Sequence, residues 1–380
     1  MLLRIFIPIN NGKFEYSLTV PYTEAYFLFF QDELEMGSFN PICFFAENDT
    51  IVFRLHFKGE DKQDEISGGE LTSAYYNYLK FSQELLRPQG NAISDSIAEL
   101  KKKDAYYSAE FKLQQEKQRI ANEKSNAENS TENDFEISIA QTKVLQGMIN
   151  RGEYVSPKGK TLNDKMDSIL VLKNQHKLNY IKNNLSLVSY YFLFRVTEYL
   201  NDYKGIAITD IKPIALEFAE KYPGHPYTQL MAVMVDGLLQ TKVGGRYYDF
   251  SANDLNGENH TLSEIIDGKY AVIDLWATWC GPCIMGSKNL LPIYEEFKDK
   301  GFTICGVARE YKNTDDLICR IEKEKFPWIN LVELDDKNQI WLHYGVQGGG
   351  RKFLVDSTGV ILAIEPDAEE IRKILNEKLK

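Results

Sequence analysis

Two cysteines, Cys280 and Cys283, are separated by two residues, and this spacing is the strongest chemical signal in the chain. At the start of a helix, two intervening residues let both sulfur atoms approach within disulfide-bonding distance. Residues 282–297 carry a helical pattern, so Cys280 should lie at a helix N-terminus, where free N–H groups and the helix dipole favour a thiolate. Because a thiolate attacks disulfides, Cys280 is the predicted nucleophile and Cys283 the predicted resolving cysteine.

Other chemistries of a cysteine pair fit this sequence less well. A structural zinc site needs four ligands, and the remaining cysteines form no second pair of this spacing. A haem attachment site needs a histidine directly after the second cysteine, where Ile284 stands. We therefore predict neither a metal ion nor a bound cofactor.

The remaining cysteines and one histidine are expected to be inert. Cys43, Cys305 and Cys319 are most simply small buried hydrophobic residues. His343 is interpreted as a packed or surface histidine and not as a catalytic base.

Asp274 lies inside the apolar run 270–276, upstream of the cysteine pair. A carboxylate inside an apolar strand is unfavourable unless it has a partner or a chemical role. The residues alone leave open the alternative that Asp274 bonds only to the backbone.

Composition limits the class of protein. The chain has 380 residues, 43% of them apolar and 26% charged, which suggests two or three globular domains. A net charge of −11 disfavours nucleic acid as a partner. The most apolar stretch, residues 185–194, is too short to span a bilayer and predicts a buried helix. No signal peptide is visible, so we expect either a cytoplasmic protein or a sequence that begins after a removed or missing leader.

Pattern changes along the chain predict three parts. Residues 1–62 are expected to form an antiparallel β domain, 63–242 a mainly helical region and 243–380 an α/β domain. The strands expected in the first part cover residues 4–9, 13–20, 26–30, 42–45 and 50–57. The helical part should include one continuous face carrying Ile93, Ile97, Leu100, Tyr107 and Phe111, a solvated connection over 121–134, and helices over 139–148, 165–182, 185–200, 211–221 and 227–239. The last part should contain strands over 270–276, 302–308 and 328–331, helices over 282–297 and 315–323, a hairpin of 353–355 with 360–364, and a helix starting at Asp367.

The active-site residues resemble the thioredoxin superfamily. Trp279 followed by Cys280-Gly281-Pro282-Cys283, with an acid in the strand upstream, is similar to the thioredoxin active-site stretch. Residues 247–257, 262–263 and 268–270 are similar to the TlpA and ResA branch. The resemblance implies a thioredoxin-like fold for 243–380 and a role for Asp274 in deprotonating Cys283. It also implies substrate contacts by Trp279, Gly281, Pro282, Gly349 and Gly350.

Two positions depart from the pattern of that family. Gly350 stands where the family keeps a cis-proline, and a cis peptide bond before glycine costs several kcal/mol more than before proline. Residues 348–350 are therefore expected to be trans, flexible or rearranged. Gly286 stands where the TlpA and ResA branch often carries glutamate, which leaves Asp274 as the only acid that the motif supplies.

The resemblance implies a thiol-disulfide oxidoreductase that reduces disulfide-bonded protein substrates and is itself reduced by an unidentified thiol donor. The first part of the chain is similar to a β domain of Bacteroidetes envelope proteins, which implies a periplasmic or envelope location and a lipid anchor on a missing leader. One alternative is a binding or scaffold protein with a partly degenerate thioredoxin-like domain. Another is a peroxiredoxin-like antioxidant, although Ala277 stands where such an enzyme needs threonine.

Overall fold

The structure is a computed structural model that describes residues 5–35, 40–56, 64–127 and 129–379. The chain forms two compact units. Unit 1 comprises the described residues of Met1–Asn48 together with Asn184–Leu200 and Ala207–Lys380. Unit 2 comprises the described residues of Asp49–Asn183 together with Asn201–Ile206.

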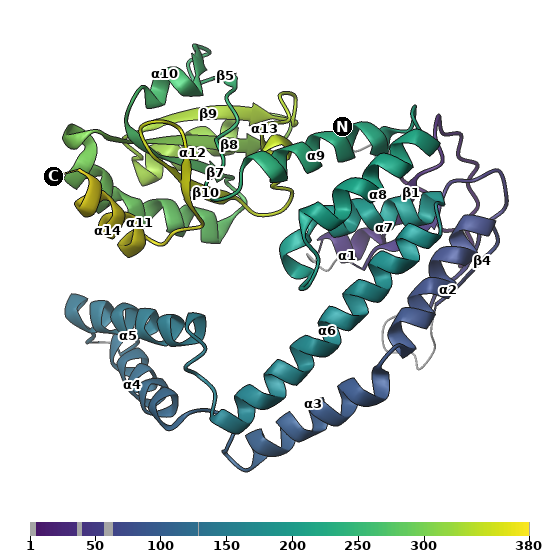
Figure 1. Ribbon diagram of the computed structural model, residues 1–380, viewed down its shortest axis with the longest axis horizontal. Helices are drawn as coiled ribbons and strands as arrows, with labels where there is room; N and C mark the ends of the chain where they lie inside the picture. Colours follow the sequence, from purple (N-terminus) through teal and green to yellow (C-terminus); the bar gives the residue numbers. More distant parts are fainter. Residues whose placement is uncertain (1–4, 36–39, 57–63, 128, 380) are drawn as a thin grey trace. The chain divides into compact units, whose positions relative to one another are not determined.

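The thioredoxin-like domain in unit 1 is built on a five-stranded sheet of order β11-β10-β7-β8-β9 (Figure 1). Its strands are β7 (Tyr270–Trp276), β8 (Phe302–Glu310), β9 (Ile329–Leu334), β10 (Arg351–Val355) and β11 (Ile361–Ile364). Strands β7, β8 and β9 run parallel, while β10 is antiparallel to both β7 and β11. Six of the seven residues of β7 are buried, as expected for a central strand covered on both faces.

Helices and a small hairpin complete this domain. Helices α11 (Gly281–Phe297) and α14 (Ala368–Lys378) pack against each other, as Figure 1 shows. The remaining elements are β5 (Ser251–Asn253), β6 (Asn259–Thr261), α10 (Leu262–Ile266), η2 (Lys298–Lys300), α12 (Asp315–Glu324) and α13 (Ile340–His343). The side chain of Asp367 accepts a hydrogen bond from Glu370 N at 2.8 Å and caps the last helix where the sequence predicts its start.

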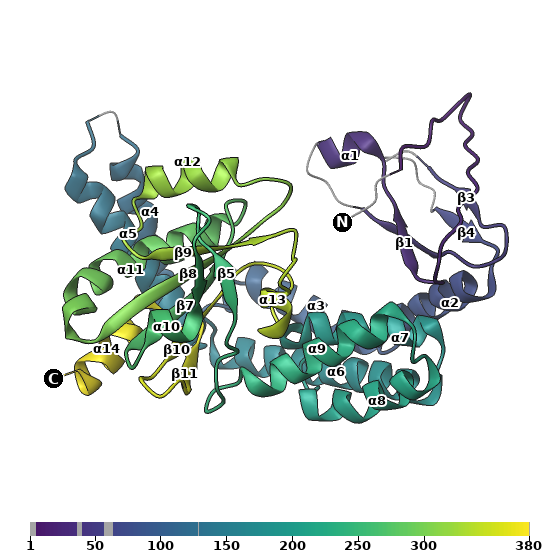
Figure 2. The same ribbon diagram turned by 90° about the horizontal axis from the view of Figure 1, so that it is seen from above.

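Helices α7 (Leu187–Glu198), α8 (Ile208–Lys221) and α9 (Pro226–Gln240) of unit 1 come directly before this domain in the sequence (Figure 2). The apolar stretch that predicts a buried helix lies mostly in α7. Helix α9 packs against α13, where a Cβ atom on Gly237 would overlap the carbonyl oxygen of His343. Strands β1 (Ala25–Leu28) and β2 (Ile42–Phe45) pair antiparallel, and α1 (Gln31–Glu35) lies between them in sequence.

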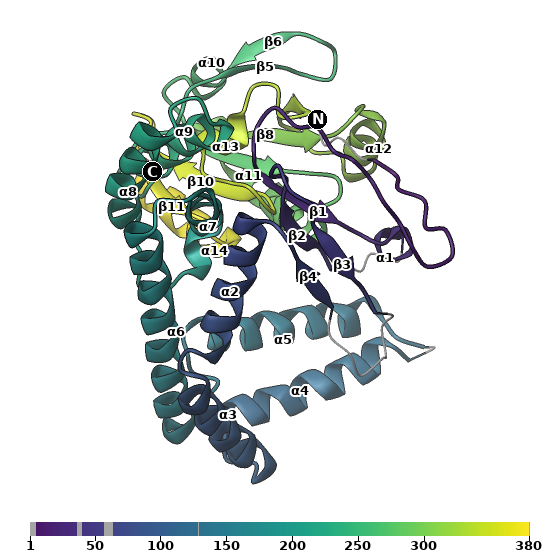
Figure 3. The ribbon, with the colours of Figure 1, turned by 90° about the vertical axis from the view of Figure 1, so that its right-hand side faces the viewer.

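Unit 2 is mainly helical, with one antiparallel pair of strands, β3 (Val52–Arg54) and β4 (Glu65–Ser67). Its helices are α2 (Glu70–Glu84), α3 (Arg87–Lys102), α4 (Ala109–Ser125), α5 (Glu132–Asn150) and α6 (Pro157–Asn183), and the short η1 (Leu200–Asp202) lies at its border with unit 1. Helices α4 and α5 lie side by side (Figure 3).

The fold class expected from the sequence is confirmed, and three details are wrong. Small antiparallel sheets, a helical middle region and a thioredoxin-like domain follow one another along the chain. However, residues 5–20 form no strand and contain only one isolated bridge, between Asn10 and Lys13. The helical face expected to run from Ile93 to Phe111 is divided between α3 and α4, because Asp104 has a positive φ of 53° and the helix cannot continue through it. The solvated connection expected over 121–134 is limited to the few residues between α4 and α5.

Among the described residues, no helix combines the length and the apolar character needed to cross a bilayer. The first residue of the expected strand 4–9 and the last residue of the expected strand 50–57 lie outside the described part of the chain.

Candidate active site

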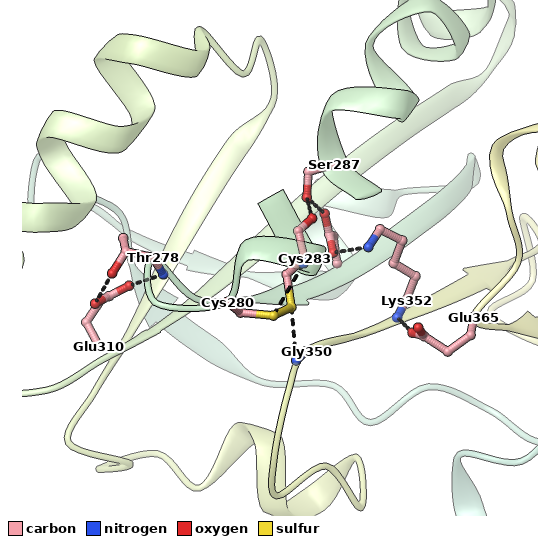
Figure 4. Close-up of a disulfide and its surroundings, with 9 residues drawn as sticks. Thr278, Cys280, Cys283, Ser287, Glu310, Gly350, Lys352 and Glu365 are labelled. Atoms are coloured by element: carbon pink, nitrogen blue, oxygen red, sulfur yellow. Dashed lines mark hydrogen bonds and ion pairs between the residues drawn. A yellow bond between two sulfur atoms is a disulfide. The ribbon is translucent and has the colours of Figure 1, made fainter. Parts of the chain in front are cut away.

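The two cysteines form a disulfide at the start of α11 (Figure 4). Their Cα atoms lie 5.3 Å apart. Cys280 is the N-cap of the helix, and its Sγ accepts a hydrogen bond from Cys283 N at 3.3 Å. The apolar strand β7 ends at Trp276 and the helix begins at Gly281, so the short loop between them places the pair beyond the C-terminal end of the central strand. The structure thus places Cys280 where backbone N–H groups stabilise a thiolate.

The backbone of residues 348–350, called here the glycine loop, lies against this disulfide. Gly350 N donates a hydrogen bond to Cys283 Sγ at 3.2 Å, and a Cβ atom added to Gly349 would lie 3.9 Å from Cys280 Sγ. A Cβ atom on Gly350 would overlap the carbonyl oxygen of Leu275 and lie 3.0 Å from Cys283 Sγ. No cis peptide bond occurs among the described residues, so this loop is trans. Glycine at position 350 therefore permits a close contact that any side chain would block.

Asp274 is fully buried in β7 and has two side-chain partners. Its Oδ2 accepts a hydrogen bond from Ser287 Oγ at 2.5 Å, and its Oδ1 lies 3.4 Å from Lys352 Nζ. Lys352 lies directly opposite Asp274 in the pairing of β10 with β7. The alternative that Asp274 bonds only to the backbone is therefore wrong. Ser287 Oγ also lies 3.0 Å from the carbonyl oxygen of Cys283, which links the buried acid to the helix that carries the cysteines.

Gly286 faces the same lysine. A Cβ atom on Gly286 would lie 2.6 Å from Lys352 Nζ. The ammonium group thus occupies the space beside α11 in which a side chain at position 286 would begin. At position 286 the TlpA and ResA branch often carries glutamate. In this chain the space beside Gly286 holds the ammonium group of Lys352, which belongs to strand β10.

A second acid near the cysteines was missed by the sequence interpretation. Glu310, the last residue of β8, accepts hydrogen bonds from Thr278 N at 2.9 Å and from Thr278 Oγ1 at 2.8 Å. Burial raises the pKa of Glu310, although the bonds from Thr278 oppose this shift. Asp274 is therefore not the only acid that supports the active-site loop. The signal in the sequence is an acid two residues after the apolar run 302–308.

The outer side of the loop is open to solvent. Trp279 is 52% exposed, and Gly281 and Pro282 are also exposed. Beside them lies a cavity of about 490 Å³. It is lined by Thr278, Trp279, Glu310, Tyr311, Asp316, Cys319, Arg320 and Lys323. The expectation that Cys319 is buried is wrong, because it lies on the exposed side of the short amphipathic helix α12.

The other residues singled out from the sequence lie in packed environments. Cys43 and Cys305 are buried as expected, and burial raises the pKa of the Cys305 thiol. His343 stacks on Tyr248 with ring centroids 3.9 Å apart, and burial lowers its pKa.

One group of side chains in the described part of the chain has metal-ligand spacing: Asp254, Glu258 and His260. Asp254 Oδ1 already accepts hydrogen bonds from Asn256 N at 2.8 Å and Glu258 N at 2.9 Å. This carboxylate therefore shapes the turn between β5 and β6, and we assign no metal to it.

Comparison with known proteins agrees with this geometry. Residues 243–364 match the AhpC/TSA family. The thiol-disulfide oxidoreductase ResA of Bacillus thuringiensis is 30% identical over 142 residues, which cover 37% of this chain and 78% of that protein. The thiol:disulfide interchange protein HelX of Rhodobacter capsulatus is 32% identical over 102 residues, which cover 27% of this chain and 54% of HelX.

Among solved structures, the crystal structure of the thioredoxin domain of a Bacteroides vulgatus thiol-disulfide oxidoreductase is 30% identical. The match has a TM-score of 0.34 and covers 37% of this chain and 99% of that domain. With a cysteine pair at the start of α11 and a ResA relative of this identity and coverage, the chain belongs to the ResA-like family of thioredoxin-like thiol-disulfide oxidoreductases.

Proposed function

We propose that the protein reduces disulfide bonds in other proteins through the Cys280 and Cys283 dithiol. The observation that carries this proposal is the position of the pair, with Cys280 at the N-terminus of α11 and both sulfur atoms next to the glycine loop. A helix N-terminus favours the thiolate that attacks a disulfide. The exposed backbone of Gly349 beside Cys280 offers an edge on which an extended substrate segment can lie.

The reaction balances in two exchange steps. The Cys280 thiolate attacks one sulfur of the substrate disulfide, forms a mixed disulfide and releases the first substrate thiol after protonation. Cys283 then loses its proton, attacks Cys280 Sγ and releases the second substrate thiol. Two electrons and two protons pass to the substrate, and the protein is left with the disulfide seen here. A separate thiol donor must then reduce this disulfide for a new cycle.

Asp274 is the proposed acceptor of the Cys283 proton. Its link to Cys283 through Ser287, and its burial beneath the helix, support this role. The Lys352 ammonium group is the second side-chain partner of this carboxylate, with Nζ 3.4 Å from Asp274 Oδ1. Trp279, Gly281, Pro282, Gly349 and Gly350 are the proposed substrate contacts, because they surround the disulfide and the first four are exposed.

Disulfide-bonded proteins of the cell envelope are the proposed substrates, and the periplasm or envelope is the proposed location. Both follow from the resemblance to the TlpA and ResA branch and to envelope proteins. Fractionation of cells that express the protein from its native gene tests the location, since a protein confined to the cytoplasm would contradict it.

Trapping of the mixed disulfide tests the proposed reaction. The Cys283→Ser variant cannot complete the second exchange, so it should accumulate covalent adducts with protein substrates that dithiothreitol releases. The wild-type protein should reduce insulin in the presence of dithiothreitol, and Cys280→Ser should abolish this activity.

Cys319→Ser is the matched control, because Cys319 is exposed near the loop but is not part of the pair. It should reduce insulin at the wild-type rate. Absence of both insulin reduction and trapped adducts would reject the reductase and favour the binding or scaffold alternative.

A further inference from the structure

Arg309 joins the glycine loop to the body of the sheet. It lies on β8, one residue before Glu310, and its side chain is only 10% exposed. Its Nη1 donates a hydrogen bond to the carbonyl oxygen of Gln347 at 2.9 Å. Its Nη2 donates to Asp336 Oδ2 at 2.5 Å. Gln347 directly precedes Gly348, so the guanidinium group is bonded to the residue from which the glycine loop starts.

Two aromatic rings hold this guanidinium group in place. Its central carbon lies 5.1 Å from the ring centroid of Trp341 and 5.7 Å from that of Tyr311. Trp341 is fully buried, and its carbonyl oxygen accepts a hydrogen bond from Val346 N at 2.8 Å. A planar guanidinium group that is both stacked and ion-paired has little freedom, so it fixes the carbonyl group that it binds.

The glycine loop depends on such outside support. Three consecutive glycines have more backbone freedom than any other residues and carry no side chains with which to order themselves. The described contacts hold the loop at its two ends, through Gln347 O bonded to Arg309 and through Gly350 N bonded to Cys283 Sγ. Between them, Gly348 and Gly349 are exposed, and a Cβ atom added to Gly349 would lie 3.9 Å from Cys280 Sγ.

We propose that Arg309 is a positioning residue that orders the glycine loop for binding of an extended segment of the protein substrate. The proposal rests on the proposed function, since it assumes that the loop binds substrate backbone. A loop held in its binding conformation before the substrate arrives loses less entropy on binding. Arg309 should therefore affect how tightly a protein substrate binds and should leave the chemistry of the cysteine pair unchanged.

Single-turnover kinetics test this proposal. The protein, carrying Cys319→Ser so that only the site dithiol reacts, is reduced, freed of reductant and mixed with insulin or with hydroxyethyl disulfide. Tryptophan fluorescence follows oxidation of the dithiol next to Trp279. In Arg309→Met, the half-saturating concentration of insulin should rise about tenfold, as expected for the loss of one charge-assisted hydrogen bond. The limiting rate with insulin and the rate with hydroxyethyl disulfide, which is too small to span the loop, should stay at the wild-type value.

Two further variants separate positioning from general damage. Arg309→Lys keeps one charged donor for Gln347 and should recover part of the insulin affinity. Asp336→Asn loosens the guanidinium group without removing its bulk and should give a smaller loss in the same direction, even if Arg309→Met fails to fold. Arg372→Met removes a half-buried arginine of α14 that is ion-paired with Glu296, and the kinetics with both substrates should stay at the wild-type values.

Hydrogen exchange gives a readout that does not depend on the substrate. The peptide containing residues 346–350 should exchange faster in Arg309→Met and Asp336→Asn than in the wild type. Unchanged exchange and unchanged insulin affinity in the folded variants would overturn the proposal, as would an equal loss of rate on both substrates. If the wild type reduces hydroxyethyl disulfide but not insulin, the proposed function fails, and faster exchange in the variants would still show that Arg309 orders the loop.

Discussion

The ion pair of Lys352 with Asp274 is the residue-level feature with the clearest energetic consequence. Asp274 is fully buried, and its partners in the described structure are the Ser287 hydroxyl and the Lys352 ammonium group. In Lys352→Met the carboxylate would keep only the hydroxyl partner. Removing one partner of a buried pair typically lowers stability by about 3–5 kcal/mol. We expect a decrease of this order in the free energy of unfolding, measured by urea denaturation at neutral pH.

The double variant Lys352→Met with Asp274→Asn tests whether the unpaired carboxylate causes the loss of stability. It removes both charges, so it should be clearly more stable than Lys352→Met alone. Asp274→Asn by itself leaves the Lys352 ammonium group without its carboxylate, so it should also be less stable than the wild type, while slowing disulfide exchange at neutral pH. If Asp274→Asn does not relieve the destabilisation, the loss comes from packing and not from the buried charge.

Cysteine reactivity provides a second test at the residue scale. In the reduced protein at neutral pH, iodoacetamide should modify Cys280 first, because the helix N-terminus favours its thiolate. The exposed Cys319 should react next, while the buried Cys43 and Cys305 should react only after unfolding. Mass spectrometry of peptides from a time course gives the order. Modification of Cys43 or Cys305 before Cys280 would contradict the assignment of the nucleophile.

The glycine loop gives a prediction at the scale of elements, because the room for a side chain differs among its three positions. Gly350→Ala would push a Cβ atom into the carbonyl oxygen of Leu275 in β7, so we expect a loss of about 1–3 kcal/mol in the free energy of unfolding. Insulin reduction should fall with it, because the N–H group next to Cys283 would be displaced. Gly348→Ala is the matched control, since nothing lies within 4 Å of its added Cβ, and it should keep wild-type stability within about 0.5 kcal/mol. Equal stability of the two variants would mean that β10 approaches β7 less closely than described.

The hydrogen bonds from Thr278 to Glu310, which join the loop before Cys280 to the end of β8, predict a dependence of stability on pH. Burial raises the pKa of Glu310, so the folded protein binds this proton more tightly than the unfolded chain does. The stability that comes from the protonated carboxyl is complete below the ordinary glutamate pKa of about 4.3 and is lost as the pH rises through the higher value of the folded state. Between pH 4 and pH 7, roughly, the wild type should therefore lose stability relative to Glu310→Gln. Urea unfolding at several pH values measures the difference, and parallel curves would show that Glu310 does not titrate in this range.

The elements that could be predicted from the sequence are those with a strong local pattern. Strand β7 coincides with the apolar run 270–276, and α11 begins one residue before the expected start. Residues 13–20 alternate as a strand would, yet they form none, because a strand also needs a neighbour to bond its backbone and the alternation does not supply one. The break between α3 and α4 depends on the backbone conformation of Asp104, which the helical spacing of the apolar residues does not reveal.

The same limit applies to the site. Cys280, Cys283 and Asp274 lie within ten residues and were found from their spacing and from the resemblance. Lys352 and Arg309 reach the site from strands that are remote in sequence, and only the pairing of β10 with β7 and the end of β8 bring them there. Charged residues at such positions resemble ordinary surface residues until the register of the sheet is known.

The division into two compact units gives a prediction for the whole molecule. Each unit is compact and is held together by contacts among its own residues. Each should therefore unfold by itself, and heating should produce two calorimetric transitions instead of one. Gly350→Ala lies in unit 1 and should lower the temperature of one transition only. A substitution in unit 2, such as Gly159→Val, should lower the other, because any Cβ atom at this position would lie 2.8 Å from the carbonyl oxygen of Tyr106. A single transition that shifts with either variant would show that the two units unfold together.

Residues 23–25 are hydrogen-bonded to residues 225–227, a segment of unit 1 that is distant in the sequence. Ala25 N donates a hydrogen bond to the Tyr227 hydroxyl at 3.1 Å, and His225 Nε2 lies 3.1 Å from the carbonyl oxygen of Thr23. The bonded residues are 202 positions apart, and the whole of unit 2 is inserted between them.

During synthesis at about 5–20 residues per second, the first strands must wait for roughly 10–40 s before their partner on α9 leaves the ribosome. Unit 2 then has time to fold first, although its sequence begins later. Protease protection of nascent chains arrested before and well after residue 227 should show residues 23–28 cleaved in the first and protected in the second. The order in which the parts of this molecule fold would thus differ from the order in which they are made.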